Sequence, residues 1–346
     1  MKTGALALPA LLVALTACGT GASPPGDEAS TRPNTVAGPF RELRDRELLE
    51  TSGAAPYPLT SVAREFRDPT VLDLDRTGQP GAAALYAVAT IAGVTGIYRF
   101  VAPDSRSFRP DPEPSTPVLR PAPSWEGGRI AAPSVHRVDD EIWLFYAGAG
   151  GIGLARSEDG VDFVREPVPV LEADETTLWE DGLPPTSPAF LRVTDDDWRL
   201  FYSANGSIGE AQSNGTLRFS RTGSGPVLGP DRAHASAFDA AAVGEPHALL
   251  ATTAEGRIVT RLYHAAVDHA GNGAIGLAAR FGIRGSFRRA YAPVLSTTRN
   301  PRSPWVLPFD ELALLFVTQQ AGASDSLAYP AVAVAVAPPT ASLCLR

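Results

Sequence analysis

The sequence predicts an all-β protein with a five-bladed β-propeller. A proline opens a short apolar strand at five places, and successive prolines are 64, 55, 58 and 58 residues apart. The five dipeptides are Asp68-Pro69, Ala132-Pro133, Ser187-Pro188, Glu245-Pro246 and Ser303-Pro304. A repeat of this length that contains only short strands and polar turns is typical of propeller blades, which surround a central channel.

Two further markers recur in phase with the prolines. A polar turn leads into an aromatic strand at 139–146 and again at 195–202, and the two segments align residue for residue, so Trp143 and Trp198 are expected in the blade core. Pro-Val-Leu closes four of the repeats, at Pro117, Pro169, Pro226 and Pro293. The predicted blades are 64–119, 130–171, 185–228, 240–295 and 302–338.

The last repeat lacks the Pro-Val-Leu ending, so its outer strand must come from elsewhere. We expect the segment 40–61 to supply this strand or to close the ring, because a circular array of sheets must hide its edges. The alternative for 41–51 is a short helix, since leucines alternate there with charges.

The N-terminal segment is predicted to be an export signal. Residues 1–17 contain Lys2, an apolar run too short to span a bilayer, and small residues before Cys18. Because Leu-Thr-Ala-Cys at 15–18 resembles the bacterial lipoprotein cleavage box, we expect Cys18 to be lipidated, although an ordinary cleavage site with an accidental cysteine is the alternative. Residues 18–39 form a flexible tether, and 40–346 form the propeller. The prediction is an exported, membrane-anchored lipoprotein of the bacterial envelope, at the outer membrane or cell surface. Cys344 then has no disulfide partner.

Composition excludes several other classes of function. The formal charge is −8 and the arginines are scattered, so we expect no nucleic acid partner. Lys2 is the only lysine, which leaves the body of the protein without a Schiff-base or P-loop lysine. The histidines lack metal-ligand spacing, so no metal and no cofactor are expected. The sequence does not specify an oligomeric state.

Two of the five residues that precede the repeated prolines are carboxylates. Residues that open equivalent inner strands gather at one mouth of the channel, so Asp68 and Glu245 are expected to share it. Cleavage of a glycosidic bond uses two such groups, one ionised and one protonated. Because blades 1 and 4 are not neighbours, the expected spacing is the wider one, roughly 6.5 to 9.5 Å, that leaves room for water.

Several motifs resemble the five-bladed propeller glycosidases: the arabinanase and xylosidase family, with invertase-like and mannoside-phosphorylase relatives. They are Phe-Arg-Asp-Pro at 66–69, the strands that end in Leu-Phe-Tyr, and Ala-Arg-Ser-Glu-Asp-Gly-Val-Asp-Phe at 155–163. The resemblance implies that Asp68 is the general base and Glu245 the general acid. It also implies an aspartate that opens the third blade and tunes the acid. The sequence has Ser187 there, and Asp181 is a possible substitute from a nearby loop.

Other residues have two interpretations each. Asp68 caps a turn or acts chemically, and Glu245 lacks the Glu-Gly-Pro context usual in the family. Arg67 binds substrate or forms a structural ion pair. Tryptophans outside the core position are candidate sugar platforms, and the histidines that closely follow a blade-opening proline either pack or bind a hydroxyl or metal. These residues are Trp125, Trp179, Trp305, His136 and His247.

The first functional hypothesis is a membrane-anchored protein that binds a carbohydrate and, if active, hydrolyses a glycosidic bond in an arabinoside, xyloside or fructoside. The alternative is a non-catalytic propeller that recognises an envelope polysaccharide or a protein, since one fold supports many functions. A structural lipoprotein without a glycan ligand is the third hypothesis.

Overall fold

The computed structural model describes residues 37–42, 63–105, 108–112, 116–253, 256–310, 312–319 and 331–337. Only the backbone is described for 42, 63, 64 and 331–337. The predicted export signal, Cys18, most of the tether and Cys344 lie outside the described residues. Within these ranges, no helix has the length and apolar character needed to cross a membrane.

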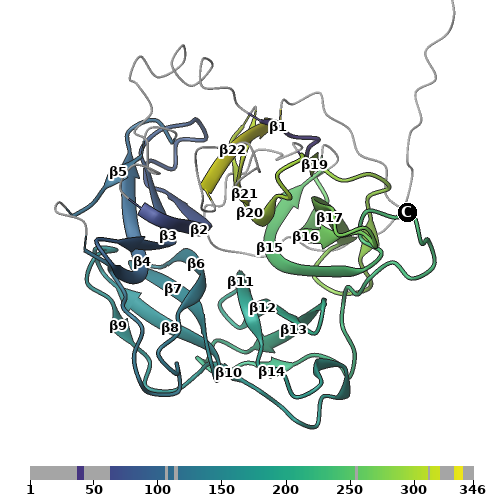
Figure 1. Ribbon diagram of the computed structural model, residues 1–346, viewed down its shortest axis with the longest axis horizontal. Helices are drawn as coiled ribbons and strands as arrows, with labels where there is room; N and C mark the ends of the chain where they lie inside the picture. Colours follow the sequence, from purple (N-terminus) through teal and green to yellow (C-terminus); the bar gives the residue numbers. More distant parts are fainter. Residues whose placement is uncertain are drawn as a thin grey trace, which may run out of the picture.

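The described strands form five antiparallel sheets around a central axis (Figure 1). The first sheet runs outwards through β2 (Ala63–Asp73), β3 (Ala83–Ile91), β4 (Val94–Ala102) and β5 (Arg109–Pro110). The second contains β6 (Ala131–Val138), β7 (Glu141–Gly148), β8 (Gly151–Ser157), β9 (Val164–Arg165) and β10 (Leu171–Glu172). The third contains β11 (Thr186–Thr194), β12 (Asp197–Ala204), β13 (Ser207–Ser213) and β14 (Ser220–Arg221).

The fourth sheet contains β15 (Ala242–Thr252), β16 (Ile258–Val267), β17 (Gly273–Phe281), β18 (Arg288–Arg289) and β19 (Leu295–Ser296). The fifth contains β20 (Arg302–Pro308), β21 (Ala313–Gln319), β22 (Ala331–Ala337) and β1 (Arg41–Glu42). The innermost strands β2, β6, β11, β15 and β20 contact one another in that order, and β20 returns to β2. Apart from the 3-10 helix η2 (Leu178–Glu180), the described residues contain no helix. The prediction of an all-β propeller is confirmed.

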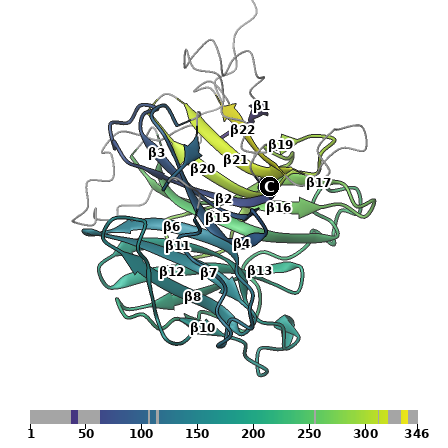
Figure 2. The same ribbon diagram turned by 60° about the vertical axis from the view of Figure 1, so that its left-hand side comes forward.

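Strand β1 is the outermost strand of the fifth sheet. It pairs antiparallel with β22 and lies beside it in both views (Figures 1 and 2). Just before β1, the backbone N–H of Phe40 donates to Val294 O at 2.7 Å, and the Phe40 ring packs on Tyr263 of the fourth sheet. The expected contribution of the segment 40–61 to ring closure is therefore seen at residues 41 and 42, where the structure has a strand and not a helix.

The core lies between neighbouring sheets, which pack face to face through apolar side chains. Trp143 and Trp198 are both buried, and their rings meet edge to face with centroids 5.2 Å apart. The prediction that both belong to the blade core is confirmed. These contacts fix each sheet against the next, and they hold the inner strands in place around the channel.

A β-bulge recurs at the start of every innermost strand. In each sheet the two residues of the blade-opening dipeptide oppose a single residue of the second strand, as between Ala131 and Ser134 in β6. The opening residues all have a left-handed backbone, with φ of 56°, 47°, 48°, 49° and 49° at Asp68, Ala132, Ser187, Glu245 and Ser303. Proline has no N–H to give to the ladder, and a bulge re-aims the neighbouring side chain. The repeated X-Pro dipeptide thus turns one residue per blade toward the channel mouth.

Candidate active site

The five blade-opening residues line one shared cavity of about 320 Å³. Its wall also includes the residues that precede them in blades 1, 2, 3 and 5, together with Ala147 and Thr318. Below it is a much smaller space of about 30 Å³, bounded by the five opening residues, their prolines and Trp305. The predicted meeting of Asp68 and Glu245 therefore occurs in the structure, at a mouth built by the five bulges.

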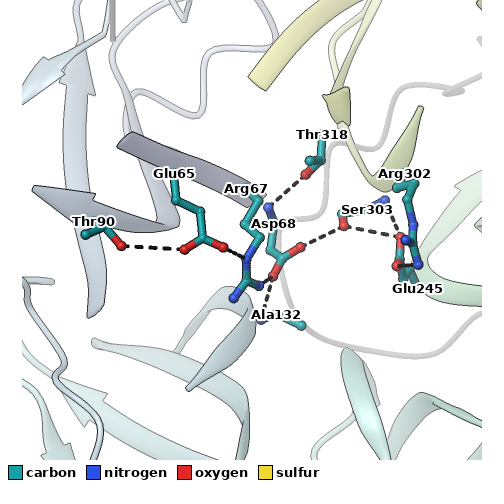
Figure 3. A network of polar contacts seen from close by, with 9 residues as sticks. All are labelled: Glu65, Arg67, Asp68, Thr90, Ala132, Glu245, Arg302, Ser303 and Thr318. Carbon is teal, nitrogen blue, oxygen red and sulfur yellow. Dashed lines mark hydrogen bonds and ion pairs between the residues drawn. The ribbon is translucent and has the colours of Figure 1, made fainter. Parts of the chain in front are cut away.

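Asp68 is held in place by three hydrogen bonds. Its carboxylate accepts from the Arg67 guanidinium, from the backbone N–H of Ala132 at 3.1 Å and from the hydroxyl of Ser303 at 2.9 Å (Figure 3). Donors aimed at a carboxylate stabilise the anion. Arg67 also pairs with Glu65 at 2.7 Å. Of its two predicted roles, Arg67 therefore has the structural one, as an ion-pair partner, and it also lines the cavity.

Glu245 is in a different environment on the other side of the mouth. Its carboxylate accepts from Arg302 and from the backbone N–H of Ser303, each at 2.7 Å. Burial raises the pKa of Glu245 above its ordinary value, the Arg302 charge works against this, and the Asp68 charge adds to it. The net effect is a carboxyl that keeps its proton to higher pH than an exposed glutamate, as a general acid requires.

The hydroxyl of Ser303 lies between the two carboxylates. Its Oγ is 2.9 Å from Asp68 Oδ1 and 3.2 Å from Glu245 Oε2, so these two oxygens are no more than about 6 Å apart (Figure 3). The expected spacing of the two carboxyl groups, roughly 6.5 to 9.5 Å, stays a prediction. Although blades 1 and 4 are not neighbours, blade 5 lies between them in the ring and fills the gap with a serine.

The backbone of each acidic residue is fixed by a hydroxyl from the preceding blade. The N–H of Asp68 donates to Thr318 Oγ1 at 2.8 Å, and the N–H of Glu245 donates to Ser203 Oγ at 2.6 Å. These N–H groups are free to do so because the bulge removes them from the ladder. Arg302, Ser303, Thr318 and Ser203 were all missed as site residues. Their positions follow from the repeat. Ser303 opens blade 5 and Arg302 comes just before it, whereas Thr318 and Ser203 lie on second strands, each paired with the residue before a blade opening.

A second and larger cavity of about 500 Å³ adjoins the first. The two share Thr186, Ser187, Glu245 and Arg302, and Asp68 belongs only to the smaller one. Small and uncharged residues provide most of the remaining wall, including Ser203, Asn205, Gly206, Gly244, Gly273 and Asn300. Glu245 thus stands at the junction of two spaces, each large enough for a sugar ring.

No third carboxylate lines these three cavities among the described residues. Ser187, which opens blade 3, borders all of them. Asp181 lies at the end of η2, where it is exposed and has a left-handed backbone with φ of 56°, and it is not among the lining residues. The structure therefore brings Asp68, Glu245 and Ser187 together at the mouth, and it places Asp181 elsewhere.

The predicted histidines and Trp305 form a packed cluster beneath the mouth. The rings of His136 and His247 lie 5.4 Å and 4.1 Å from Trp305 between centroids. Trp305 Nε1 donates to Val71 O at 2.8 Å, and His247 Nε2 is 3.1 Å from Val306 O. Burial lowers the pKa of both histidines to about 3, so both are neutral at physiological pH. Of the two roles predicted for these histidines, the structure shows packing. Trp305 forms part of the floor of the cavity.

Trp125 and Trp179 occupy matching positions in the bodies of blades 2 and 3. They stack on Tyr146 and Tyr202 with centroids 5.8 Å and 6.1 Å apart. Each is followed by a fully buried glutamate that accepts from the same tyrosine: Glu126 and Glu180. The Trp-Glu dipeptide therefore recurs in blades 2 and 3 at equivalent positions. The prediction from the sequence did not use this repeat, so it placed both tryptophans outside the repeated pattern.

Comparison with known proteins shows the fold alone. No protein-family model matches the chain, and no curated protein sequence does. A thermostable family-43 glycoside hydrolase is 17% identical, with a TM-score of 0.57 over 81% of this chain and 92% of its own. The catalytic domain of a family-62 α-L-arabinofuranosidase from Coprinopsis cinerea is 14% identical, with a TM-score of 0.58 over 88% and 98%.

A third similar structure is an α-L-arabinofuranosidase from Podospora anserina in complex with cellotriose. It is 12% identical, with a TM-score of 0.56 over 90% of this chain and 100% of its own. The resemblance recognised from sequence motifs is thus matched at the level of structure. The chain has the β-propeller fold of these glycoside hydrolases.

Proposed function

We propose that the protein hydrolyses a glycosidic bond at the channel mouth, with Asp68 as general base and Glu245 as general acid. The observation that carries this proposal is the pair of unlike carboxylates on one cavity. Each carboxylate accepts from an arginine and from a backbone N–H, and burial raises the pKa of Glu245 above its ordinary value. Hydrolysis of a glycosidic bond needs one ionised carboxylate and one carboxyl that keeps its proton, and Glu245 is the group whose burial favours the proton.

The two cavities suggest how the substrate lies. A general acid must reach the oxygen of the leaving group, and Glu245 is the carboxylate that borders both spaces. The sugar whose anomeric carbon is attacked therefore occupies the smaller cavity with Asp68, and the leaving group extends into the larger one. The uncharged wall of the larger cavity favours a neutral sugar there. An arabinoside, xyloside or fructoside fits this description.

The test is turnover by the purified protein on a panel of aryl glycosides and neutral oligosaccharides, followed by release of aglycone and reducing ends. We expect activity on at least one pentoside or fructoside, and loss of activity by at least about 10²-fold in Asp68→Asn, since general base catalysis contributes 10² to 10⁴. Unchanged turnover in Asp68→Asn would remove this residue from the mechanism.

Recognition of a glycan without hydrolysis is the second candidate function. It is favoured by Ser187, which stands where the resembling glycosidases have a tuning aspartate, and by the Arg302 ion pair on Glu245. Titration calorimetry with neutral cell-wall oligosaccharides separates the two functions. Equal binding by the wild type and Asp68→Asn, with no product from either protein, would establish recognition alone.

We also propose that the protein is lipidated at Cys18 and anchored to the bacterial envelope. The support is the sequence of the export signal and its cleavage box. Acyl chains contribute about 0.8 kcal/mol for each buried methylene, so several chains anchor firmly. Fractionation of expressing cells tests this: wild type should partition with membranes and into detergent, and Cys18→Ala should not. A wild-type protein found only in the aqueous phase would refute the anchor.

A further inference from the structure

The position of Ser303 is set by the ring itself. This residue opens blade 5, which lies between blade 4 with Glu245 and blade 1 with Asp68. Its bulge turns the side chain into the mouth, where Oγ is within hydrogen-bond distance of one oxygen from each carboxylate. Its backbone N–H also donates to Glu245 Oε2 at 2.7 Å. Figure 3 shows Ser303 between the two acids.

A serine hydroxyl has one proton, so it cannot donate to both carboxylates at once. If both were ionised, one of the two short contacts would join two acceptors and would be repulsive. If Glu245 Oε2 carries a proton, both contacts become hydrogen bonds, because Glu245 donates to Ser303 and Ser303 donates to Asp68. The geometry is therefore satisfied by a single proton on one of the two facing carboxylate oxygens, and the burial of Glu245 favours Glu245 as the group that carries it.

We propose that the Ser303 hydroxyl is a positioning group that couples the protonation of the two carboxylates, holding the proton on Glu245 while Asp68 stays ionised. The tuning role that the resembling glycosidases give to a carboxylate in blade 3 is thus filled from blade 5, by a neutral group. The catalytic meaning of this inference rests on the proposed hydrolysis. The coupling itself does not.

Other charged groups at the mouth act on the same equilibrium. Arg302 pairs with Glu245 Oε1 and favours its ionised form, whereas the Asp68 charge favours the protonated form. Arg67 favours ionised Asp68, and Glu65 partly neutralises Arg67. Removal of the Ser303 hydroxyl leaves all four charges in place, so its effect can be measured against a constant electrostatic background.

The test uses two variants, Ser303→Ala and Ser303→Gly. Alanine is tolerated in this backbone conformation, since Ala132 opens blade 2 with φ of 47°. Glycine adopts a positive φ without strain. Both variants keep the backbone N–H that binds Glu245 and lose the hydroxyl. Effects common to both are due to the hydroxyl, and effects seen only in one are due to the backbone.

The primary readout is the titration of the side-chain carboxyls by ¹³C NMR, with signals assigned from Glu245→Gln and Asp68→Asn. We expect the midpoint of Glu245 to fall in both variants, so that the separation between the two carboxyl midpoints shrinks. In turnover, the bell-shaped pH profile of kcat/KM should become narrower. Its acid limb reports the general base Asp68, and its alkaline limb reports the general acid Glu245. Thr95→Val is the matched control: it loses a hydroxyl that bonds Thr90 on an exposed hairpin and touches neither carboxylate, so the separation of the midpoints should persist.

Unchanged carboxyl midpoints in both serine variants would overturn the inference. It would also be overturned if Ser303→Gly titrated like the wild type while Ser303→Ala did not, because both variants lack the hydroxyl. The NMR readout does not require activity. If the midpoints move and no glycoside is cleaved, the coupling stands and the proposed function fails. If glycosides are cleaved and the midpoints do not move, the coupling fails alone.

Discussion

Ser203 and Thr318 occupy the same register position in blades 3 and 5, and each accepts a hydrogen bond from the backbone N–H of an acidic residue that opens the next blade. The corresponding residues in the other three blades are Val88, Ala147 and Ala265, which have no hydroxyl. Hydroxyls are thus found where the following blade presents a carboxylate. Both the backbone and the side chain of each acid are therefore held by hydrogen bonds, as a catalytic group requires.

Loss of either hydroxyl should impair the site. In Thr318→Val the buried N–H of Asp68 loses its acceptor, which costs about 1 to 3 kcal/mol and lets the acid shift. We expect kcat/KM to fall by about tenfold or more, since each 1.4 kcal/mol of lost transition-state stabilisation is tenfold in rate. Thr95→Val is the control, because Thr95 lies on an exposed hairpin and bonds Thr90. Equal kinetics in the two variants would show that the Thr318 contact is dispensable.

The role of Glu245 can be tested through the leaving group. A general acid matters most when the departing oxygen is basic, so Glu245→Gln should lose about 10² to 10⁴-fold in turnover on alkyl glycosides and oligosaccharides. On aryl glycosides with acidic phenols the loss should be much smaller. Asp68→Asn should be equally impaired on both classes, because activation of water is needed in either case. A uniform loss in Glu245→Gln would contradict its assignment as the acid.

Arg302 should set the alkaline limit of activity. Its charge lowers the pKa of Glu245 against the larger effect of burial, so removal of the charge lets the pKa rise further. The alkaline limb of kcat/KM should therefore move to higher pH in Arg302→Met. Because the arginine is 53% exposed, wild type in high salt should show part of the same displacement. A limb that moves to lower pH would mean that Arg302 does not act through Glu245.

The buried glutamates of the blades should contribute to stability through their arginines. Glu180 is fully buried and pairs with Arg221 at 2.6 Å. Arg221→Met removes the ion pair of that buried charge and leaves it only the hydrogen bond from Tyr202, so we expect unfolding in denaturant to become easier by about 3 kcal/mol. Glu180→Gln in the same chain should restore part of the loss. Arg192→Met serves as control, because its partners Asp139 and Asp195 are exposed. If Arg221→Met and Arg192→Met lowered the free energy of unfolding by similar amounts, burial of the glutamate would not be the cause of the loss.

Acid should weaken the fold through His247 and His264, which are buried, and His136, which is half-buried. Burial lowers the pKa of His136 and His247 to about 3 and that of His264 to about 4. The unfolded chain, with histidine pKa values near 6.5, then binds more protons than the folded one at intermediate pH. Stability should be full above about pH 6.5 and fall as the pH drops toward 4, by up to about 4 kcal/mol per pH unit for three protons. Melting temperatures across this range check the slope, which should shrink by about a third in His264→Phe. A melting temperature that does not change from pH 7 to pH 5 would refute this account.

The sequence was sufficient to predict the repeat, the propeller and the meeting of Asp68 with Glu245, because strand period, turn residues and blade-opening prolines are local signals. It did not reveal the residues around the acids. Ser303 and Arg302 come from a blade remote in sequence, and only the bulge turns them toward the mouth.

Ring closure by β1 ties the two ends of the propeller into one sheet. Its partner β22 is the last described strand, so this sheet can be completed only after the strands of the other four sheets have been synthesised. A pull on the segment before Ala37 is transmitted to Phe40 at Val294 and Tyr263, and to the short β1–β22 ladder. Such a load therefore reaches the ring at the outermost strand of the fifth sheet, whereas the two acids lie on the innermost strands β2 and β15.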